Sequence, residues 1–189
     1  MKPEVIIRTC SARMRPGANE ELTWFRQQPT LGEAIRLAAL AVNSRGKRYS
    51  HQRRLRKTVL EQARDILLAN EEQISQRIDF DDLFALLESL LARIKGLGEL
   101  YIYDTALRTG AKPGMLPKRV YLHAGTREGV KAPGFDGRMK TLDVSQLPEW
   151  LQQLKPHEIE DVLCIFKDKL MKASEQTVRE ELIRRSWCS

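Results

Sequence analysis

The clearest hydrophobic pattern in the chain predicts an amphipathic helix over residues 80–94. Its apolar residues recur at spacings of three and four, which places them on one face of an α-helix. They are Phe80, Leu83, Phe84, Leu87, Leu90, Leu91 and Ile94. Asp79 precedes them and is of a type favoured at a helix N-cap. A stripe this wide has to be buried, so we expect the helix to be central in the core.

Similar patterns predict further helices on both sides. Thr30 and Glu33 have the spacing of a capping box at a helix start. Ser50 is placed to cap a long helix that reaches about Ile74. More helices are expected from residue 100 to about 110, from 143 to 154, from Pro156 onward and from Ser174 onward.

These elements predict an all-α fold, a multi-helix globular domain of about seven to nine helices. Residues 1–30 are expected to form an N-terminal arm, in which Val5–Ile7 is either a short strand or the start of a helix. Residues 31–130 are expected to form the helical core. Residues 131–189 are expected to be a loop and C-terminal helices that pack on the same domain.

A glycine turn follows the central helix and is the most informative local feature. The helix leads directly into Gly96-Leu97-Gly98, and a second apolar-patterned segment starts at once. Glycine takes positive φ and has no Cβ, so the pair lets the chain reverse between helices. The N–H groups of Gly98, Glu99 and Leu100 would then open a helix, where such donors suit a phosphate oxygen. The alternative is a tight turn between two core helices.

A basic segment lies upstream of this turn. Seven of the thirteen residues from Arg45 to Lys57 are Lys or Arg. Cations in the first turns of a helix oppose its dipole, which favours acids there. A bound anion would explain the arrangement, and a solvated basic face is the equally plain alternative.

Composition favours a polyanionic partner for the 189-residue chain. Its formal net charge of +7 indicates nucleic acid first and an anionic membrane surface second. No apolar run approaches the ~20 residues of a membrane span, and no signal peptide is evident, so we expect a cytoplasmic protein. Cys10, Cys164 and Cys188 are far apart and show no metal-ligand spacing, so neither a metal site nor a cofactor is predicted. Cys164 is expected to be a small buried residue.

The stretch from Leu90 to Arg127 resembles the helix-hairpin-helix motif of DNA-binding proteins, in particular of DNA glycosylases. The resemblance is carried by Gly96-Leu97-Gly98 and by Val120-Tyr121-Leu122-His123. It implies sequence-independent binding of the DNA backbone. The family's catalytic Asp falls on Tyr121, and the Lys that some members use falls on Leu100. A glycosylase needs a carboxylate to stabilise positive charge on the sugar, so the resemblance implies DNA binding without base excision. The whole chain also resembles a bacterial protein family, which implies no mechanism.

Four residues are candidates for chemistry. His123 lies close in sequence to Tyr121 and Arg127, and an imidazole in such a setting is a candidate general acid or base. More often such a histidine is a hydrogen-bonded structural residue. Asp104 is the remaining candidate carboxylate, with an intrahelical pair to Arg108 as the favoured structural alternative.

Three hypotheses follow. The first is a non-enzymatic protein that binds duplex DNA through its phosphates. The second is a nucleic-acid repair enzyme, glycosylase- or lyase-like, with a pocket around His123, Tyr121 and Arg127. The third and weakest is a protein-interaction module, and the oligomeric state stays open. The expected nucleic-acid contacts are Arg45, Lys47, Arg48, Arg53, Arg54, Lys95, Gly96, Leu97, Gly98, Glu99, Leu100, Arg108, Lys112 and Arg127.

Overall fold

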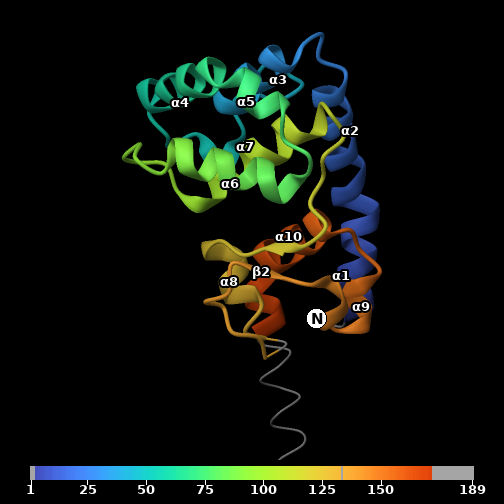
Figure 1. Ribbon diagram of the computed structural model, residues 1–189. Coiled ribbons are helices and arrows are strands. Elements are labelled where there is room, and N and C mark those ends of the chain that lie inside the picture. Colours follow the sequence, from blue (N-terminus) through green and yellow to red (C-terminus); the bar gives the residue numbers. More distant parts are fainter. Residues whose placement is uncertain (1–2, 133, 172–189) are drawn as a thin grey trace, which may run out of the picture. The chain divides into compact units, whose positions relative to one another are not determined.

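The computed structural model describes residues 3–132 and 134–171 of the chain (Figure 1). Within these ranges the chain forms ten α-helices and one sheet of two short strands, so the predicted all-α, multi-helix class is confirmed. The predicted helix from Ser174 lies outside the described residues. Within the described part of the chain, no helix combines the length and the apolar character needed to span a membrane.

Contacts divide the chain into two compact units. Of the described residues, unit 1 comprises 3–15, 118–132 and 134–171, and unit 2 is Pro16–Pro117. This division differs from the expected boundaries at residues 30 and 130. The reason lies in the core of unit 1, where Ile6 and Cys10 are buried in the same cluster as Val162 of the C-terminal part. The first helix is therefore part of a core rather than of an arm.

In the described part of the chain, unit 1 combines four α-helices with the sheet. Its elements are α1 (Pro3–Thr9), a π-helical turn (Cys10–Met14), β1 (Val120–Tyr121), α8 (Ala124–Gly129), β2 (Thr141–Leu142), a 3-10 turn (Val144–Gln146), α9 (Glu149–Gln152) and α10 (Pro156–Ile165). The α1 helix contains Val5–Ile7, so the strand considered there is wrong. The strands are instead β1 and β2, which pair antiparallel with Val120 opposite Leu142 and Tyr121 opposite Thr141. Pro156 opens α10 at a first-turn position, as predicted.

Two glycines let α8 approach α10 closely. A Cβ on Gly129 would lie 2.1 Å from the Leu163 carbonyl oxygen, and one on Gly125 would lie 2.5 Å from Cys164 Sγ. Both distances are far below van der Waals contact. The glycines in the α8 segment therefore allow the backbone of this short helix to rest directly on α10.

Unit 2 is a bundle of helices. Its elements are α2 (Arg15–Arg26), α3 (Leu31–Ala39), a 3-10 turn (Ser50–Gln52), α4 (Lys57–Ala69), α5 (Glu71–Ser75), α6 (Phe80–Leu91) and α7 (Glu99–Ala111). Figure 1 shows α3, α4, α6 and α7 gathered in this unit, where α3 packs on α4 and α7, and α6 packs on α7. Phe80, Leu83, Leu87 and Leu91 are the buried face of α6, as the periodicity predicts.

Two predicted caps are confirmed in unit 2. The Thr30 hydroxyl accepts a hydrogen bond from the Glu33 N–H at 3.1 Å, and the Asp79 carboxylate accepts one from the Asp82 N–H at 2.9 Å. Each side chain replaces an acceptor that the first turn of a helix lacks. The glutamate half of the expected box at Thr30 is used otherwise, because the Glu33 carboxylate pairs with Arg36.

The long helix expected from Ser50 is wrong. Ser50 begins a 3-10 turn, α4 starts only at Lys57 after the extended residue Arg56, and it ends at Ala69. The intervening residues are held away from a helical path by tertiary bonds. Arg48 Nη1 donates to the Leu55 carbonyl at 2.9 Å, and the Gln52 side chain is tied to α7.

Candidate functional site

The glycine turn lies on the surface of unit 2 between α6 and α7. Gly96 has φ of +99°, a conformation that L side chains rarely adopt, so the turn needs glycine at this position. Gly98 is extended and is the N-cap of α7. A Cβ added to either glycine would meet no atom within 4 Å, which shows open space around both residues. The turn is therefore not a corner buried in the packing.

The N-cap residue of α7 is Gly98, which has no side chain and makes no side-chain cap hydrogen bond. The residues from Lys95 to Leu100 are all exposed or partly exposed. The positive end of the dipole of this 13-residue helix thus faces solvent. This geometry is the one required if backbone donors at the turn are to meet a ligand.

A pocket joins the turn to the basic segment. Its volume is about 390 Å³, and it is lined by Arg54, Leu55, Arg56, Val59, Lys95 and Gly96. The first four residues lie before or within α4, and the last two follow α6. Two features that the sequence shows about forty residues apart therefore share one surface depression. The volume lies within the ~300–1,000 Å³ range of small-ligand sites.

Three cations line this pocket without a competing acid. Arg54, Arg56 and Lys95 are exposed, and none of them forms an ion pair within the described residues. The expected contacts Arg45, Lys47 and Arg53 are exposed as well. A net positive surface that lacks internal counter-ions attracts anions from solution.

Arg108 and Lys112 were also expected to contact nucleic acid. Both side chains instead bind groups within unit 2. The Lys112 ammonium donates to the backbone carbonyls of Arg26 and Gln28. Arg108 is 7 % exposed, and its guanidinium donates to Gln52 Oε1 at 3.0 Å and to Asp104 Oδ2 at 3.1 Å. Arg48 has one guanidinium nitrogen committed to a backbone carbonyl. The structure thus separates the cations that hold unit 2 together from those that face solvent.

Asp104 is the centre of a polar network in unit 2. In addition to Arg108, its Oδ2 receives a hydrogen bond from Gln52 Nε2 at 2.7 Å and lies 2.7 Å from His51 Nε2. The structural alternative to catalysis, the Asp104–Arg108 pair, is confirmed. This network ties the basic segment to α7, and it therefore fixes the position of the pocket wall.

Tyr49 extends the network to α2. The Arg108 guanidinium lies 3.7 Å from the centroid of the Tyr49 ring, and the Tyr49 hydroxyl donates to Glu21 at 2.6 Å. Burial raises the pKa of Tyr49 well above its usual range, against the lowering effect of Arg108. The ring therefore stays neutral and serves as a platform for the cation.

In unit 1, His123 lies at the start of α8. Its backbone N–H donates to Thr126 Oγ1 at 2.7 Å, and the imidazole is buried, with 2 % of the residue exposed. The ring nitrogen Nε2 is in hydrogen-bond contact with a carboxylate oxygen of Glu160, which is 5 % exposed. Glu160 is a partner that the sequence analysis missed, since it lies 37 residues away on another helix.

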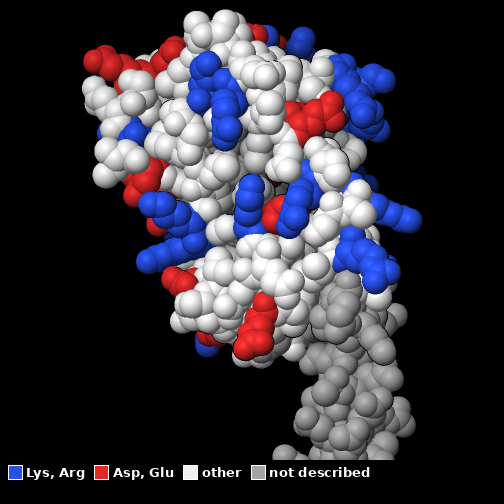
Figure 2. Space-filling model, turned by 90° about the vertical axis from the view of Figure 1, so that its right-hand side faces the viewer, with Lys and Arg blue, Asp and Glu red and all other residues white. Residues whose placement is uncertain are grey.

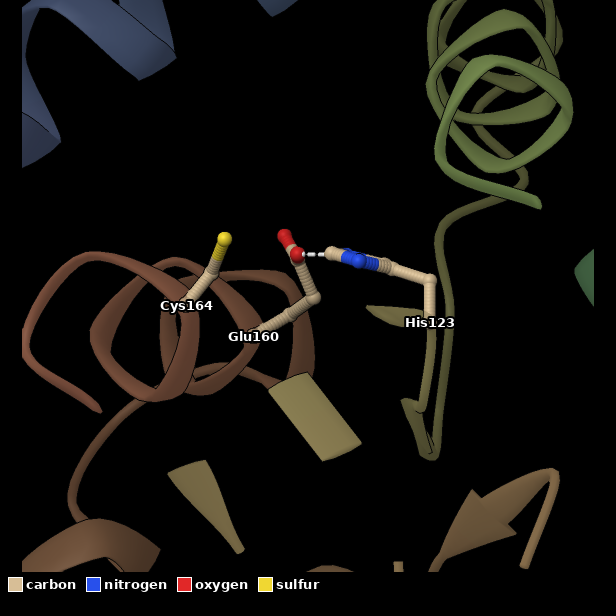
Figure 3. A group of neighbouring side chains, drawn as sticks. All are labelled: His123, Glu160 and Cys164. Atoms are coloured by element: carbon tan, nitrogen blue, oxygen red, sulfur yellow. Dashed lines mark hydrogen bonds and ion pairs between the residues drawn. The ribbon is translucent and has the colours of Figure 1, made fainter. Parts of the chain in front are cut away.

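Cys164 completes a cluster with these two residues (Figure 3). Glu160 and Cys164 are four residues apart on α10, so their side chains lie on one face of the helix. His123 reaches the same place from the segment between β1 and α8. One donor atom from each residue lies within 4.8 Å of the others. Cys164 is only partly buried, so the expectation of a core residue is wrong.

The other two candidates of unit 1 are Arg127 and Tyr121. Arg127 Nη1 donates to the carbonyls of Gly137 at 3.0 Å and Met139 at 3.1 Å, which links α8 to the connection before β2. Tyr121 is part of β1 and is 7 % exposed. Asp104 belongs to unit 2, so the four candidates of the sequence analysis are divided between the units.

Charge alone does not define an interface. On the face drawn in Figure 2, Lys and Arg side chains occur in several separate groups with Asp and Glu between them. The net charge of +7 is thus not one uniform basic surface on that face. The pocket at Gly96 is selected by its geometry and by the lack of ion pairs at its cations.

No family model, no curated protein and no solved structure matches this chain. The resemblance to the helix-hairpin-helix motif therefore stays a prediction based on its own residues.

Proposed function

We propose that unit 2 binds the phosphate backbone of duplex DNA, largely independently of sequence. One observation carries the proposal: Arg54, Arg56 and Lys95 line a single pocket beside the glycine turn. Guanidinium groups bind phosphate through two parallel N–H donors, and an ammonium adds a point charge. The uncapped start of α7 supplies backbone donors at the same place.

The contacts of this site position a backbone and read no bases. The pocket is lined by cations, two aliphatic side chains and a glycine, and it lacks the Asn or Gln side chains that pair with adenine edges. Contacts of this kind give affinity that falls steeply with salt concentration. We therefore expect similar affinity for unrelated duplexes of equal length.

Reversing two charges in the pocket tests the proposal. The double variant Arg54→Glu/Arg56→Glu should lose roughly 100-fold in affinity for duplex DNA at low salt, because it removes two phosphate contacts and adds repulsion. The slope of log affinity against log salt should become shallower by about 0.9 for each lost contact. The measurement is fluorescence anisotropy with a labelled duplex over a salt series.

Arg26→Glu is the matched control. Arg26 is an exposed arginine of unit 2 whose side chain does not line the pocket. This variant should keep most of the affinity, although its net charge changes in the same direction. The single variants Arg54→Glu and Arg56→Glu change the net charge by the same amount as Arg26→Glu. If each of them loses no more affinity than Arg26→Glu, the effect is one of net charge and the pocket is refuted as the interface.

Gly98→Asp tests the turn without risk to the fold. Gly98 has ordinary negative φ and open space around its Cα, and Asp is a good N-cap that should stabilise α7 by roughly a few tenths of a kcal/mol relative to Gly. The same carboxylate would repel a phosphate at the start of α7. Binding should fall about tenfold while thermal stability rises, and unchanged binding would show that the turn does not contact DNA.

The enzymatic alternative rests on His123 and its contact with Glu160, an arrangement of imidazole and carboxylate that proton transfer also uses. Incubation with a panel of damaged duplexes and nucleotides tests it, with His123→Ala as the variant. Turnover that depends on His123 would support it. Salt-insensitive or absent DNA binding together with no turnover would favour a protein-interaction module.

A further inference from the structure

We propose that His123, Glu160 and Cys164 bind a divalent transition-metal ion, Zn²⁺ in the first place. The proposal goes beyond DNA binding, because it concerns unit 1 and uses none of the pocket residues. The three side chains offer one nitrogen, one oxygen and one sulfur donor within 4.8 Å of one another. Zn²⁺ accepts all three donor types, whereas Mg²⁺ and Ca²⁺ prefer oxygen alone.

The geometry is close to that of a coordination shell. Ligand atoms bonded to tetrahedral zinc at 2.0–2.3 Å lie about 3.5 Å apart. The longest separation allowed by the cluster, 4.8 Å, requires a contraction of about 1 Å, within the reach of side-chain rotations. The His123 and Glu160 donors are already in contact. A metal ion would take the place of the proton between them, as metal binding commonly displaces protons from its ligands.

The surrounding structure positions the backbone of all three ligand residues. The backbone bond to Thr126 fixes the His123 main chain, and the i, i+4 spacing fixes Glu160 and Cys164 on one face of α10. Gly125 leaves the space in which the thiol lies, because a Cβ there would be 2.5 Å from Sγ. Cys164 is only partly buried, which provides a side from which an ion can enter.

Three protein ligands leave one position of a tetrahedral ion open. In zinc proteins this arrangement accompanies a bound water or substrate atom, whereas closed structural sites use four protein ligands. We therefore assign the site to the class with an exchangeable fourth ligand.

The test uses the full-length protein after removal of metal with a chelator. A calorimetric titration of the metal-free protein with Zn²⁺ alone should show one tight site for each chain. His123→Gln, Glu160→Gln and Cys164→Ala should each weaken it at least tenfold. Cys10→Ala is the matched control, since it removes a buried thiol of the same unit that is outside the cluster, and it should bind like wild type.

Titration with Co²⁺ reports the ligands directly. Wild type and Cys10→Ala should show the near-ultraviolet charge-transfer band of a cobalt thiolate, and Cys164→Ala should lose it. Circular dichroism of the metal-free proteins identifies variants that do not fold. Cys164 is only partly buried, so Cys164→Ala is the variant least expected to disturb the fold. Absence of Zn²⁺ binding by folded wild type, or binding that survives Cys164→Ala unchanged, would overturn the proposal.

Discussion

The two units each gather polar side chains around a helix, and they do so with opposite chemistry. In unit 2 the network on α7 contains its own cation, because the Arg108 guanidinium lies against Asp104 and Tyr49. In unit 1 the cluster that α10 and His123 form consists of an imidazole, a carboxylate and a thiol. The first arrangement is complete within the chain, whereas the second has the composition of a metal site.

The comparison separates structural from functional charge. The buried network of unit 2 is structural, and the proposed phosphate-binding residues of that unit are the exposed cations of the neighbouring pocket. In unit 1 the cluster itself forms the proposed binding site. One unit is thus suited to an anion at its surface and the other to a cation in a mostly buried place.

The largest effect that tests this contrast is expected from Arg108→Met. The variant removes the Arg108 guanidinium from the mostly buried Asp104 carboxylate, which should cost about 3–5 kcal/mol of unit 2 stability. Hydrogen exchange of the α7 amides measures the loss in this unit alone. Arg53→Met, at an exposed arginine of the same unit, should stay within about 0.5 kcal/mol of wild type. A similar small change for Arg108→Met would show that the network is not structural.

The next effect concerns the glycines of α8. In Gly129→Ala the new Cβ would meet the Leu163 carbonyl oxygen at 2.1 Å, a backbone atom that moves only if the two helices separate. We expect a loss of about 3 kcal/mol. In Gly125→Ala the Cβ would meet the Cys164 thiol, which can rotate away at a cost of about 1 kcal/mol.

These two variants also sharpen the metal proposal. A rotated thiol is turned from His123 and Glu160, so Gly125→Ala should lower Zn²⁺ affinity by more than its small effect on stability suggests. Urea unfolding and Zn²⁺ titration of both proteins give the comparison. A Gly125→Ala protein with wild-type Zn²⁺ affinity would exclude Cys164 in its present position as a ligand.

The smallest effect is a pH dependence of unit 1. His157 is 4 % exposed, its Nδ1 has no hydrogen-bond partner among the residues that the structure describes, and burial lowers its pKa below the usual 6.5. Below pH 6.5, His157 therefore binds a proton more readily in the unfolded chain than in the folded chain. The contribution of the neutral His157 to folding stability is fully present above pH 6.5. It decreases as the pH falls below 6.5, by at most about 1.4 kcal/mol per pH unit.

The replacement His157→Leu should flatten this dependence. Urea unfolding between pH 7.5 and pH 5.5, with a chelator present, measures it. Glu158 acts at lower pH. Burial raises its pKa, but the hydrogen bond from Arg15 and the one from the Lys155 N–H outweigh this effect and hold its pKa below 4.5. A wild-type curve that stays level through pH 6, parallel to that of the variant, would contradict the assignment to His157.

Local patterns predicted much of the secondary structure. The Asp79 cap and the α6 stripe were readable because a helix places residues three and four apart on one face and needs an acceptor in its first turn. The pattern failed at Ser50–Arg56. These residues have a possible cap, but tertiary bonds from Gln52 and Arg48 hold them outside a helix. The pattern also left residues 1–30 as an arm without a clear element, whereas helical structure runs from Pro3 to Arg26 and includes Pro16 in the first turn of α2.

The candidate sites also combine features that the sequence predicts with features that only the fold determines. A run of cations and a glycine turn are visible in the sequence, because charge and backbone freedom are properties of single residues. Whether Arg54 faces solvent while Arg108 is buried against Asp104 depends on what the fold packs beside each one. The Glu160 partner of His123 is 37 residues away, and no spacing rule within one helix or loop connects them.

By itself, then, the sequence determined a helical protein with excess positive charge and a turn that only glycine can make, since these follow from periodicity, composition and allowed φ. The tertiary structure alone decided which cations remain available to a ligand, and which imidazole, carboxylate and thiol meet. Such proximity arises when distant helices bury their apolar faces together, and the neighbours that this packing selects cannot be read from either helix alone.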